Sequence, residues 1–386
     1  MIDSIEFENY RAFKTSQCLQ LKPITVIFGK NNSGKTALLK LPVLLETSLN
    51  GNINEVFASE TSSGLKICTE MRDVVFGKSN KSVHFRVSDS KKNIFLDYNF
   101  YVDITSKIQT HIERYRIEEN DRSIFSFEDE DLKTSLIDFK GAILVTDNKI
   151  SQLDSLKFKT DYIGSVRTAP EIDIRLISDS PDYSGTNGYN CYQYLINESL
   201  KTNSDFVEKV SAWYEKNFDG WRISVNKRIA PIYHIEMISK DFAVNILDTG
   251  FGIIQSMPIV IRATRKCTEP TLVILEEPET HLHPAAHASL GELIAMSAID
   301  DKNKKYLIET HSFNFLLRLR RLIAEKRLSA DDVAFYYVNF DKETCSSKLN
   351  QIKIDSNGLI DESTPWPEGI FEESLQEVIG IRDANS

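Results

Sequence analysis

The strongest chemical signal in the sequence is a glycine-rich run between an apolar segment and a predicted helix. The run is Gly29-Lys30-Asn31-Asn32-Ser33-Gly34-Lys35-Thr36, and it follows the buried-strand pattern Ile24-Thr25-Val26-Ile27-Phe28. Glycines in such a loop let backbone N–H groups converge on a phosphate, while the lysine reaches the outer phosphate oxygens. The run therefore predicts a site for ATP and Mg²⁺, in which Lys35 binds phosphate and the Thr36 hydroxyl binds the metal.

A second signal lies far downstream, where four strand-forming residues end in paired carboxylates. The segment reads Leu272-Val273-Ile274-Leu275-Glu276-Glu277-Pro278-Glu279. Two acids at the end of one strand can divide the work of hydrolysis. Glu276 would hold the Mg²⁺ water shell, and Glu277 would polarise the water that attacks the γ-phosphate. A solvated acidic turn is the alternative interpretation of these residues.

A histidine follows the next predicted strand. Tyr306-Leu307-Ile308-Glu309 ends in Thr310-His311-Ser312, and a Thr280-His281-Leu282-His283-Pro284 segment lies between the two strands. A histidine that emerges beside the acidic strand can reach a γ-phosphate and respond to its presence. We therefore expect His311 to take part in catalysis, with a purely structural histidine as the alternative.

The remaining chemical segment is a pair of glycines that opens an apolar helix. It reads Asp248-Thr249-Gly250-Phe251-Gly252-Ile253-Ile254-Gln255, and the helix is expected to run from Ile253 to Ile261. Free N–H groups at a helix N-terminus attract anions. Thr249, Gly250 and Gly252 are therefore candidates to bind a γ-phosphate, although a plain turn would have the same pattern.

An α/β fold would bring these segments together, and the hydrophobic pattern predicts one. Apolar strands are expected at 5–10 and 24–28. The last third of the chain alternates between the two kinds of element, with strands at 271–275, 306–310 and 333–339 and helices near 285–298 and 313–326. Between these parts, short alternating strands occupy about 65 to 165, and amphipathic helices lie near 189–201 and 203–218.

The predicted architecture is a mixed sheet flanked by helices and interrupted by a β-rich and helical insert. Its expected divisions are the first half of the nucleotide-binding unit (1–64), the insert (65–240), the second half of the unit (241–345) and a C-terminal extension (346–386).

Composition limits the classes of protein. The 386 residues carry a net charge of -10, so any surface that binds nucleic acid would have to be local. The five cysteines form no C-x-x-C pair, which is typical of reduced thiols. The N-terminus lacks a signal-peptide pattern, and no apolar run reaches about 18 residues. We expect a cytoplasmic protein without a membrane segment.

Taken in order, the segments resemble the ABC-type ATPase heads of the SMC-like and OLD-nuclease superfamily along nearly the whole chain. The opening Ile5-Glu6-Phe7-Glu8-Asn9-Tyr10-Arg11-Ala12-Phe13 is similar to the family's first strand, whose arginine, here Arg11, lies near the nucleotide. Residues 248–255 resemble the family's signature, 276–284 its Walker B motif and D-loop, and 309–312 its switch histidine. The tail Trp366-Pro367-Glu368-Gly369-Ile370-Phe371 resembles that of stand-alone prokaryotic members with an uncharacterised C-terminal extension.

The resemblance implies a P-loop ABC-type ATPase head that converts ATP and water to ADP and phosphate. It also implies a homo-oligomer, either a dimer or a dimer of dimers, in which the signature contacts ATP held by the partner head. OLD nucleases continue into a nuclease domain of well over a hundred residues, whereas about 75 residues follow His311 here. A nuclease or toxin activity would then come from a separate effector protein, with DNA or RNA as a further candidate partner. A role in antiphage defence or DNA maintenance follows from family analogy alone.

Two features depart from the family pattern. No serine precedes the signature glycines, so Thr249 is the only nearby hydroxyl, and no residue of the insert can be assigned as the Q-loop glutamine. The ATPase subunit of a transporter complex is an alternative function. A small-molecule kinase is another, but it would not need the signature, the paired carboxylates and the histidine together.

Two charged segments are open to two interpretations each. The basic run consists of Arg318, Arg320, Arg321, Lys326 and Arg327. It predicts either a solvated helix face or a local patch for nucleic acid or a partner. The tail from 361 to 386 has seven acids and one base, and it is expected either to be solvated or to dock on the basic run.

Overall fold

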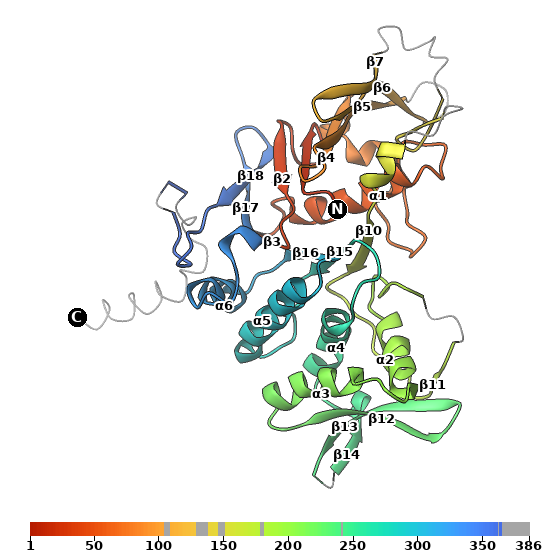
Figure 1. The fold of residues 1–386 in the computed structure, drawn as a ribbon, viewed down its shortest axis with the longest axis vertical. Coiled ribbons are helices and arrows are strands. Elements are labelled where there is room, and N and C mark those ends of the chain that lie inside the picture. Colours follow the sequence, from red (N-terminus) through yellow and green to blue (C-terminus); the bar gives the residue numbers. More distant parts are fainter. Residues whose placement is uncertain are drawn as a thin grey trace, which may run out of the picture.

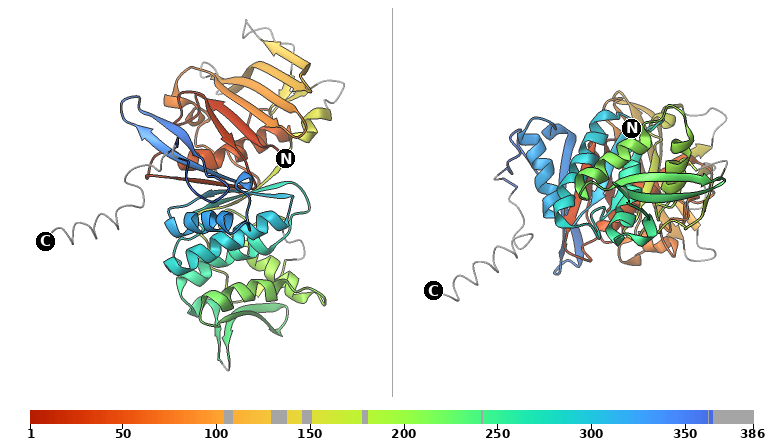
Figure 2. Two further views of the ribbon diagram at one scale, coloured as in Figure 1. Left: turned by 60° about the vertical axis from the view of Figure 1, so that its left-hand side comes forward. Right: turned by 90° about the horizontal axis from the view of Figure 1, so that it is seen from below.

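The computed structural model describes residues 1–103, 109–128, 138–145, 151–177, 181–240, 242–361 and 363–364. The molecule is elongated, and three parts follow one another along its long axis (Figures 1 and 2). A β-rich lobe lies at one end, an α/β core in the middle and a helical lobe at the other end. The predicted α/β class is confirmed.

A six-stranded sheet forms the core. Its order is β10 (Lys159–Ile163), β15 (Thr271–Glu276), β16 (Lys304–Glu309), β3 (Ile24–Gly29), β17 (Val333–Asp341) and β18 (Ser346–Ile352). Neighbouring strands are parallel except for β17 and β18, which pair in antiparallel fashion. The predicted strands of the last third are therefore confirmed, and they share one sheet with the strand that precedes the glycine-rich run.

The buried strands face two hydrophobic cores because successive side chains point to opposite sides of a sheet. On β15, Leu272 and Ile274 join a core shared with α1 (Lys35–Asn50) and the β-rich lobe. Val273 and Leu275 join a second core on the other face. That face is covered by α4 (Phe251–Thr264), α5 (Pro284–Asp300) and α6 (Phe313–Ala324).

The β-rich lobe contains a second six-stranded sheet, which is antiparallel throughout. Its order is β2 (Gln17–Gln20), β1 (Ser4–Glu8), β4 (Val83–Asp89), β5 (Ile94–Asp103), β6 (Gln109–Glu119) and β7 (Arg122–Glu128). The lobe also contains a two-stranded sheet of β8 (Asp138–Lys140) and β9 (Ile143–Val145) and the 3₁₀ helices η1 (Met71–Val74), η2 (Phe76–Lys78) and η3 (Ser151–Ser155). Alternation along β4 buries Val83, Phe85 and Val87, as the sequence pattern predicts.

The helical lobe contains α2 (Asn190–Leu200) and α3 (Phe206–Asn217), which confirm the two predicted amphipathic helices. Its small sheet was not predicted. It consists of β11 (Ile174–Arg175), β12 (Arg222–Ile229), β13 (Ile232–Ser239) and β14 (Phe242–Asn245), followed by η4 (Ile246–Asp248); a further 3₁₀ helix, η5 (Ala330–Asp332), precedes β17. Polar and charged residues interrupt the apolar positions of β12, which weakens its strand pattern in the sequence.

Three segments belong to a different part of the fold from the one expected. Strand β10 falls inside the predicted insert, but it pairs with β15 in the core sheet. Strand β18 falls inside the predicted C-terminal extension, but it pairs with β17. Strand β1 was assigned to the nucleotide-binding unit, but it pairs with β2 and β4 in the β-rich lobe. Each pairing crosses one of the divisions drawn from the sequence. Local sequence patterns do not reveal which strands pair.

The tail motif 366–371 lies outside the described residues, as does nearly all of the acidic tail. Within the described ranges, no helix has the length and apolar character needed to cross a membrane.

Candidate functional site

The chemical segments meet at one edge of the core sheet. Strands β15, β16 and β3 are parallel neighbours, so their carboxyl ends lie side by side. The glycine-rich run follows β3, the paired carboxylates end β15, and His311 follows β16. Crevices at the carboxyl ends of parallel strands are the usual ligand sites of such sheets.

The glycine-rich run turns directly into α1, as predicted. Gly34 caps the helix with φ 101°, in the region that favours glycine. A Cβ on Gly29 would lie 2.3 Å from the carbonyl oxygen of Val338, so β17 limits this position to glycine. Asn31, Asn32 and Thr36 are exposed on the loop and at the helix start.

Two buried groups of the run have the chemistry to bind a phosphate. The Ser33 side chain is buried, and its Oγ has no hydrogen-bond partner among the described residues. The Lys35 Nζ donates to the carbonyl oxygens of Gly29 and Lys30, each at 3.0 Å, and is only 4 % exposed. An unpartnered hydroxyl and a buried ammonium beside a helix N-terminus fit the oxygens of a nucleotide phosphate.

Glu309 lies opposite Lys35 and was not among the predicted site residues. Its Oε1 is 3.4 Å from the Lys35 Nζ, and both side chains are buried. Burial raises the pKa of Glu309 to about 7; the charge of Lys35 opposes this shift, and those of Glu276 and Glu277 add to it. The available signal was an acid in the last position of a buried strand, next to a site that binds an anion.

Glu276 is held by two groups of the β10 segment. Its carboxylate accepts hydrogen bonds from the Tyr162 hydroxyl and, at 3.3 Å, from the backbone N–H of Ser165. Burial raises the pKa of Tyr162 well above its ordinary value, and the negative charge of Glu276 raises it further. Tyr162 therefore stays a neutral donor that orients Glu276. The carboxylate of Glu276 and the exposed hydroxyl of Thr36 are oxygen ligands of the kind Mg²⁺ prefers.

Glu277 and His311 face each other. The Glu277 backbone has φ 41°, an uncommon value for a side chain-bearing residue, and its N–H donates to the Glu309 carbonyl oxygen at 2.8 Å. Its Oε2 accepts from the Thr280 hydroxyl at 3.0 Å, and its Oε1 is 3.7 Å from His311 Nε2. The His311 Nε2 is also 4.0 Å from Glu309 Oε1. The candidate base, the candidate phosphate sensor and Glu309 therefore form one cluster.

Glu279 fixes the backbone that carries His311. Its Oε1 accepts from the Thr310 hydroxyl at 2.7 Å and from the His311 N–H at 2.8 Å. Glu279 is 6 % exposed, which makes these contacts an internal brace between the ends of β15 and β16. Its role was not predicted, because an acid in a Pro-Glu-Thr turn has the pattern of a solvated residue.

The signature segment lies beside the segment that follows β15, where Phe251 contacts the ring of His281. The Thr249 hydroxyl donates to the carbonyl oxygen of Ile246, so it is already used within the segment. Gly252 packs against the turn that follows β15, where a Cβ on Gly252 would lie 2.5 Å from the His281 carbonyl oxygen. A Cβ on Gly250 would meet nothing within 4 Å. The structure thus groups the signature with the segment after β15 and leaves open space at Gly250.

Arg11 lies near the site without reaching into it. It follows β1 with φ 48°, and its guanidinium donates to the carbonyl oxygen of Ile67 in the β-rich lobe. Its Nε is buried without a partner among the described residues. Burial lowers the pKa of Lys40 on α1, and the charge of Arg11 lowers it further. The guanidinium therefore lies near α1, the helix that follows the predicted phosphate loop.

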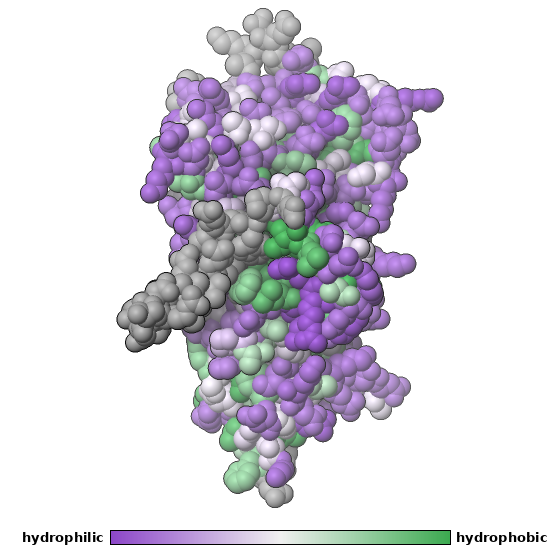
Figure 3. Space-filling model, turned by 90° about the vertical axis from the view of Figure 1, so that its left-hand side faces the viewer, coloured by the Kyte–Doolittle hydropathy of each residue, from purple (hydrophilic) through white to green (hydrophobic). Residues whose placement is uncertain are grey.

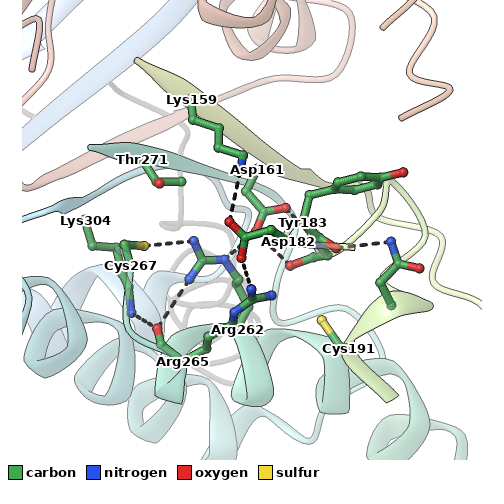
Figure 4. Close-up of polar contacts among 12 residues, drawn as sticks. Lys159, Asp161, Asp182, Tyr183, Cys191, Arg262, Arg265, Cys267, Thr271 and Lys304 are labelled. Atoms are coloured by element: carbon green, nitrogen blue, oxygen red, sulfur yellow. Dashed lines mark hydrogen bonds and ion pairs between the residues drawn. The ribbon is translucent and has the colours of Figure 1, made fainter. Parts of the chain in front are cut away.

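A buried ion network at β10 holds α4 against the sheet (Figure 4). Asp161 pairs with Arg262 of α4 and accepts from the N–H and hydroxyl of Ser184 at 2.8 and 2.9 Å. Burial lowers the pKa of Arg262, but the charge of Asp161 and smaller contributions from Cys267 and Tyr306 together raise it above its ordinary value. Close by, burial lowers the pKa of Lys304 to about 8. Strand β10 therefore anchors the helix that begins with the signature.

The side chains of the basic run form ion pairs and hydrogen bonds with other residues of the chain. Arg318 and Arg327 both pair with Glu292 of α5. Arg320 donates to the Gly358 carbonyl oxygen at 2.9 Å, Arg321 pairs with Glu325, and Lys326 donates to Ser356 and Asn357. These partners favour a structural helix face over a free basic patch. The face shown in Figure 3 is hydrophilic over most of its area, with apolar side chains gathered near its middle and smaller apolar areas elsewhere.

Comparison with family models identifies two regions. A model described as an AAA ATPase domain matches residues 1–230 and 186–316. A model described as a protein of unknown function (DUF3696) matches residues 328–379. A search of curated proteins gave no match.

Comparison with solved structures agrees with the fold. An SMC head bound to the C-terminal winged-helix domain of ScpA matches with a TM-score of 0.52 and 10% identity, over 91% of this chain and 98% of that chain. The SMC head domain from Thermotoga maritima matches with a TM-score of 0.45 and 8% identity, over 92% and 99%. A Pyrococcus furiosus SMC head with an extended coiled coil, bound to the C-terminal domain of ScpA, matches with a TM-score of 0.49 and 10% identity, over 99% and 99%.

Proposed function

The chain belongs to the AAA ATPase domain family and is an ATPase with an SMC-like head fold, and we propose that two copies close around ATP and hydrolyse it between them. One observation carries this proposal. The glycine-rich run, the paired carboxylates and His311 meet at one edge of the sheet, whereas Gly250 of the signature faces open space. A candidate phosphate-binding segment whose Gly250 is left uncovered by the described residues is what a site shared between two heads requires.

Each side chain of the site then has a role in hydrolysis. Lys35 exchanges its contact with Glu309 for the β- and γ-phosphate oxygens, and Asn31, Asn32, Ser33 and the glycines of the run surround them. Thr36 and Glu276 would hold Mg²⁺, which would neutralise phosphate charge there.

Glu277 is the proposed general base. It accepts a proton from water as the water oxygen attacks the γ-phosphorus and ADP departs. The Nε2 of His311 lies 3.7 Å from Glu277 Oε1, which supports a role for His311 beside that carboxylate at the γ-phosphate. The Thr280 hydroxyl orients the other oxygen of Glu277.

The role of Glu277 is tested by a substitution and a matched control. Glu277→Gln keeps the shape of the side chain but cannot take the proton, so ATP hydrolysis should fall roughly 10²-fold while ATP still binds. Glu343→Gln is the matched control, because Glu343 is exposed on the turn between β17 and β18. Steady-state hydrolysis and calorimetric ATP binding are measured together. Unchanged hydrolysis in Glu277→Gln would remove Glu277 from the mechanism.

We further propose that closure of the two heads controls a separate effector protein or a nucleic-acid transaction, in DNA maintenance or antiphage defence. The similar SMC head with a TM-score of 0.52 was solved with a domain of ScpA bound. This supports a head that works with a partner protein. Copurification of the full chain with and without ATP tests the proposal. Recovery of an integral membrane protein in place of a soluble effector or nucleic acid would favour a transporter subunit.

A further inference from the structure

A buried arginine joins the signature helix to the paired carboxylates. Arg167 lies in the loop that follows β10 and is 2 % exposed. Its NH2 donates to the carbonyl oxygens of Glu276 and Glu277, each at 2.8 Å. Its Nε donates to the Gly164 carbonyl oxygen at 3.0 Å. One guanidinium therefore holds the backbone of both acids and fixes its own loop.

The same arginine is bound on its other side by Gln255 of α4. Its NH1 donates to the Gln255 carbonyl oxygen at 3.1 Å. Its backbone N–H donates to the Gln255 side-chain oxygen at 3.2 Å, and the Gln255 amide donates back to the Arg167 carbonyl oxygen at 2.6 Å. Gln255 is also 2 % exposed. These three reciprocal contacts make the loop and the first turns of α4 move together.

The chemistry of this link differs from an ordinary buried ion pair. All four side-chain hydrogen bonds of Arg167 end on backbone carbonyl oxygens, so the cation is bound by main-chain geometry. Burial lowers the pKa of Arg167 to about 10, while the charges of Glu279, Glu277 and Glu276 oppose the shift. The planar fork of a guanidinium is required to span three segments at once, which a lysine ammonium does not do.

We propose that Arg167 is a positioning residue that transmits the contact between α4 and the partner head's ATP to the carboxylates Glu276 and Glu277 of its own head. The inference rests on the proposed function, since it takes Gly250 to face the partner's nucleotide. A shift of α4 on closure moves Gln255, which moves Arg167 and the two carbonyl groups that it holds. The direction of the Glu277 side chain then changes, because it extends from the same turn. ATP bound to one head thereby sets the catalytic alignment of the other.

The test compares Arg167→Lys with Arg262→Lys. Arg262 is another buried arginine, which anchors a later turn of the same helix to Asp161. Hydrolysis is measured as a function of ATP concentration, together with thermal unfolding and with ATP binding at low protein concentration. For Arg167→Lys we expect kcat to fall at least tenfold, the Hill coefficient to fall towards one, and ATP affinity of the single head to change less than threefold. Arg262→Lys should keep its Hill coefficient.

A second variant tests the same link without a change at Arg167, in case Arg167→Lys does not fold. Gln255→Met leaves Arg167 in place but removes the amide that forms hydrogen bonds with the Arg167 backbone. This variant should lose cooperativity as Arg167→Lys does. Equal effects of the Arg167 and Arg262 substitutions, or a loss of ATP affinity that accounts for the whole change in rate, would assign Arg167 a structural role only. If the unaltered protein shows no ATP-dependent association at all, the shared site itself is wrong, which is a separate result.

Discussion

Replacement of Glu309 by glutamine should stabilise the nucleotide-free protein, and the gain should grow with pH. Glu309 is 6 % exposed and lies 3.4 Å from Lys35. Burial raises the pKa of its carboxyl group to about 7, from an ordinary value of 4.5. The folded protein therefore prefers a neutral carboxyl group at this position, and glutamine resembles that neutral form.

The sign and size of the effect follow from linkage. A raised folded-state pKa contributes stability that is fully present below the unfolded pKa of 4.5 and is lost as pH rises through about 7. The difference between the two pKa values corresponds to roughly 3 kcal/mol of lost stability at alkaline pH. At pH 5.5 only about 1 kcal/mol of that loss has appeared. Glu309→Gln should recover these amounts.

Urea unfolding without nucleotide at pH 5.5 and 8.5 measures the effect. The free energy of unfolding of Glu309→Gln should exceed that of the unaltered protein at both values, with about 2 kcal/mol more gain at the higher pH. Glu343→Gln, on an exposed turn, serves as the control for a lost surface charge. A gain that does not depend on pH would refute the raised pKa of Glu309. A loss at pH 8.5 would mean that the Lys35 ion pair outweighs the burial of the carboxylate.

Three further predictions concern the site and its surroundings. Lys35→Ala should abolish ATP binding in calorimetry, because the charge that reaches the β- and γ-phosphates is lost; unchanged affinity would contradict the assignment of the glycine-rich run. Gly252→Ala should lower the free energy of unfolding by roughly 1–3 kcal/mol, because its Cβ would lie 2.5 Å from a carbonyl oxygen, whereas Gly250→Ala, in open space, should cost less than about 1 kcal/mol through the poorer helix cap; equal unfolding midpoints would contradict this. Arg318→Glu should cost about 1 kcal/mol of stability by setting a like charge beside Glu292, without a change in DNA binding; a loss of DNA binding at unchanged stability would restore the basic run as an interaction surface.

Local sequence patterns were sufficient to predict the strands and the helix that carry the chemical segments. The apolar run before Gly29 predicts a fully buried parallel strand, and α1 begins at Lys35 as expected. The strands that end in Glu276 and precede His311 are also recovered, because both faces of a parallel strand are buried and the sequence shows it. The alignment of these strand ends at one edge then follows from the topology of a parallel sheet.

The contacts that hold the site were not visible in the sequence. Asp161 lies in a short polar strand, and only Arg262 and Ser184 make its burial favourable. Arg167 and Gln255 are 88 residues apart, and Arg167 belongs to none of the motifs recognised in the sequence, although Gln255 ends the signature segment. The Lys35–Glu309 pair depends on β16 lying beside β3. Such contacts are set by tertiary packing, which short-range periodicity does not encode.

The most direct test of the shared site is the mass of the protein in solution with ATP and Mg²⁺. Glu277→Gln should hold ATP without hydrolysing it, so light scattering should report twice the monomer mass with ATP and the monomer mass without it.

Gly250→Asp in the same background supplies the decisive comparison. Gly250 is the N-cap of α4 with φ -62°, where aspartate is a favoured residue, so the monomer should remain at least as stable. A carboxylate there would repel the γ-phosphate of the partner head, and the account predicts that the dimer dissociates. A mass that does not depend on ATP, or an ATP-dependent dimer that persists in Gly250→Asp, would contradict the proposal that the signature of one head completes the ATP site of the other.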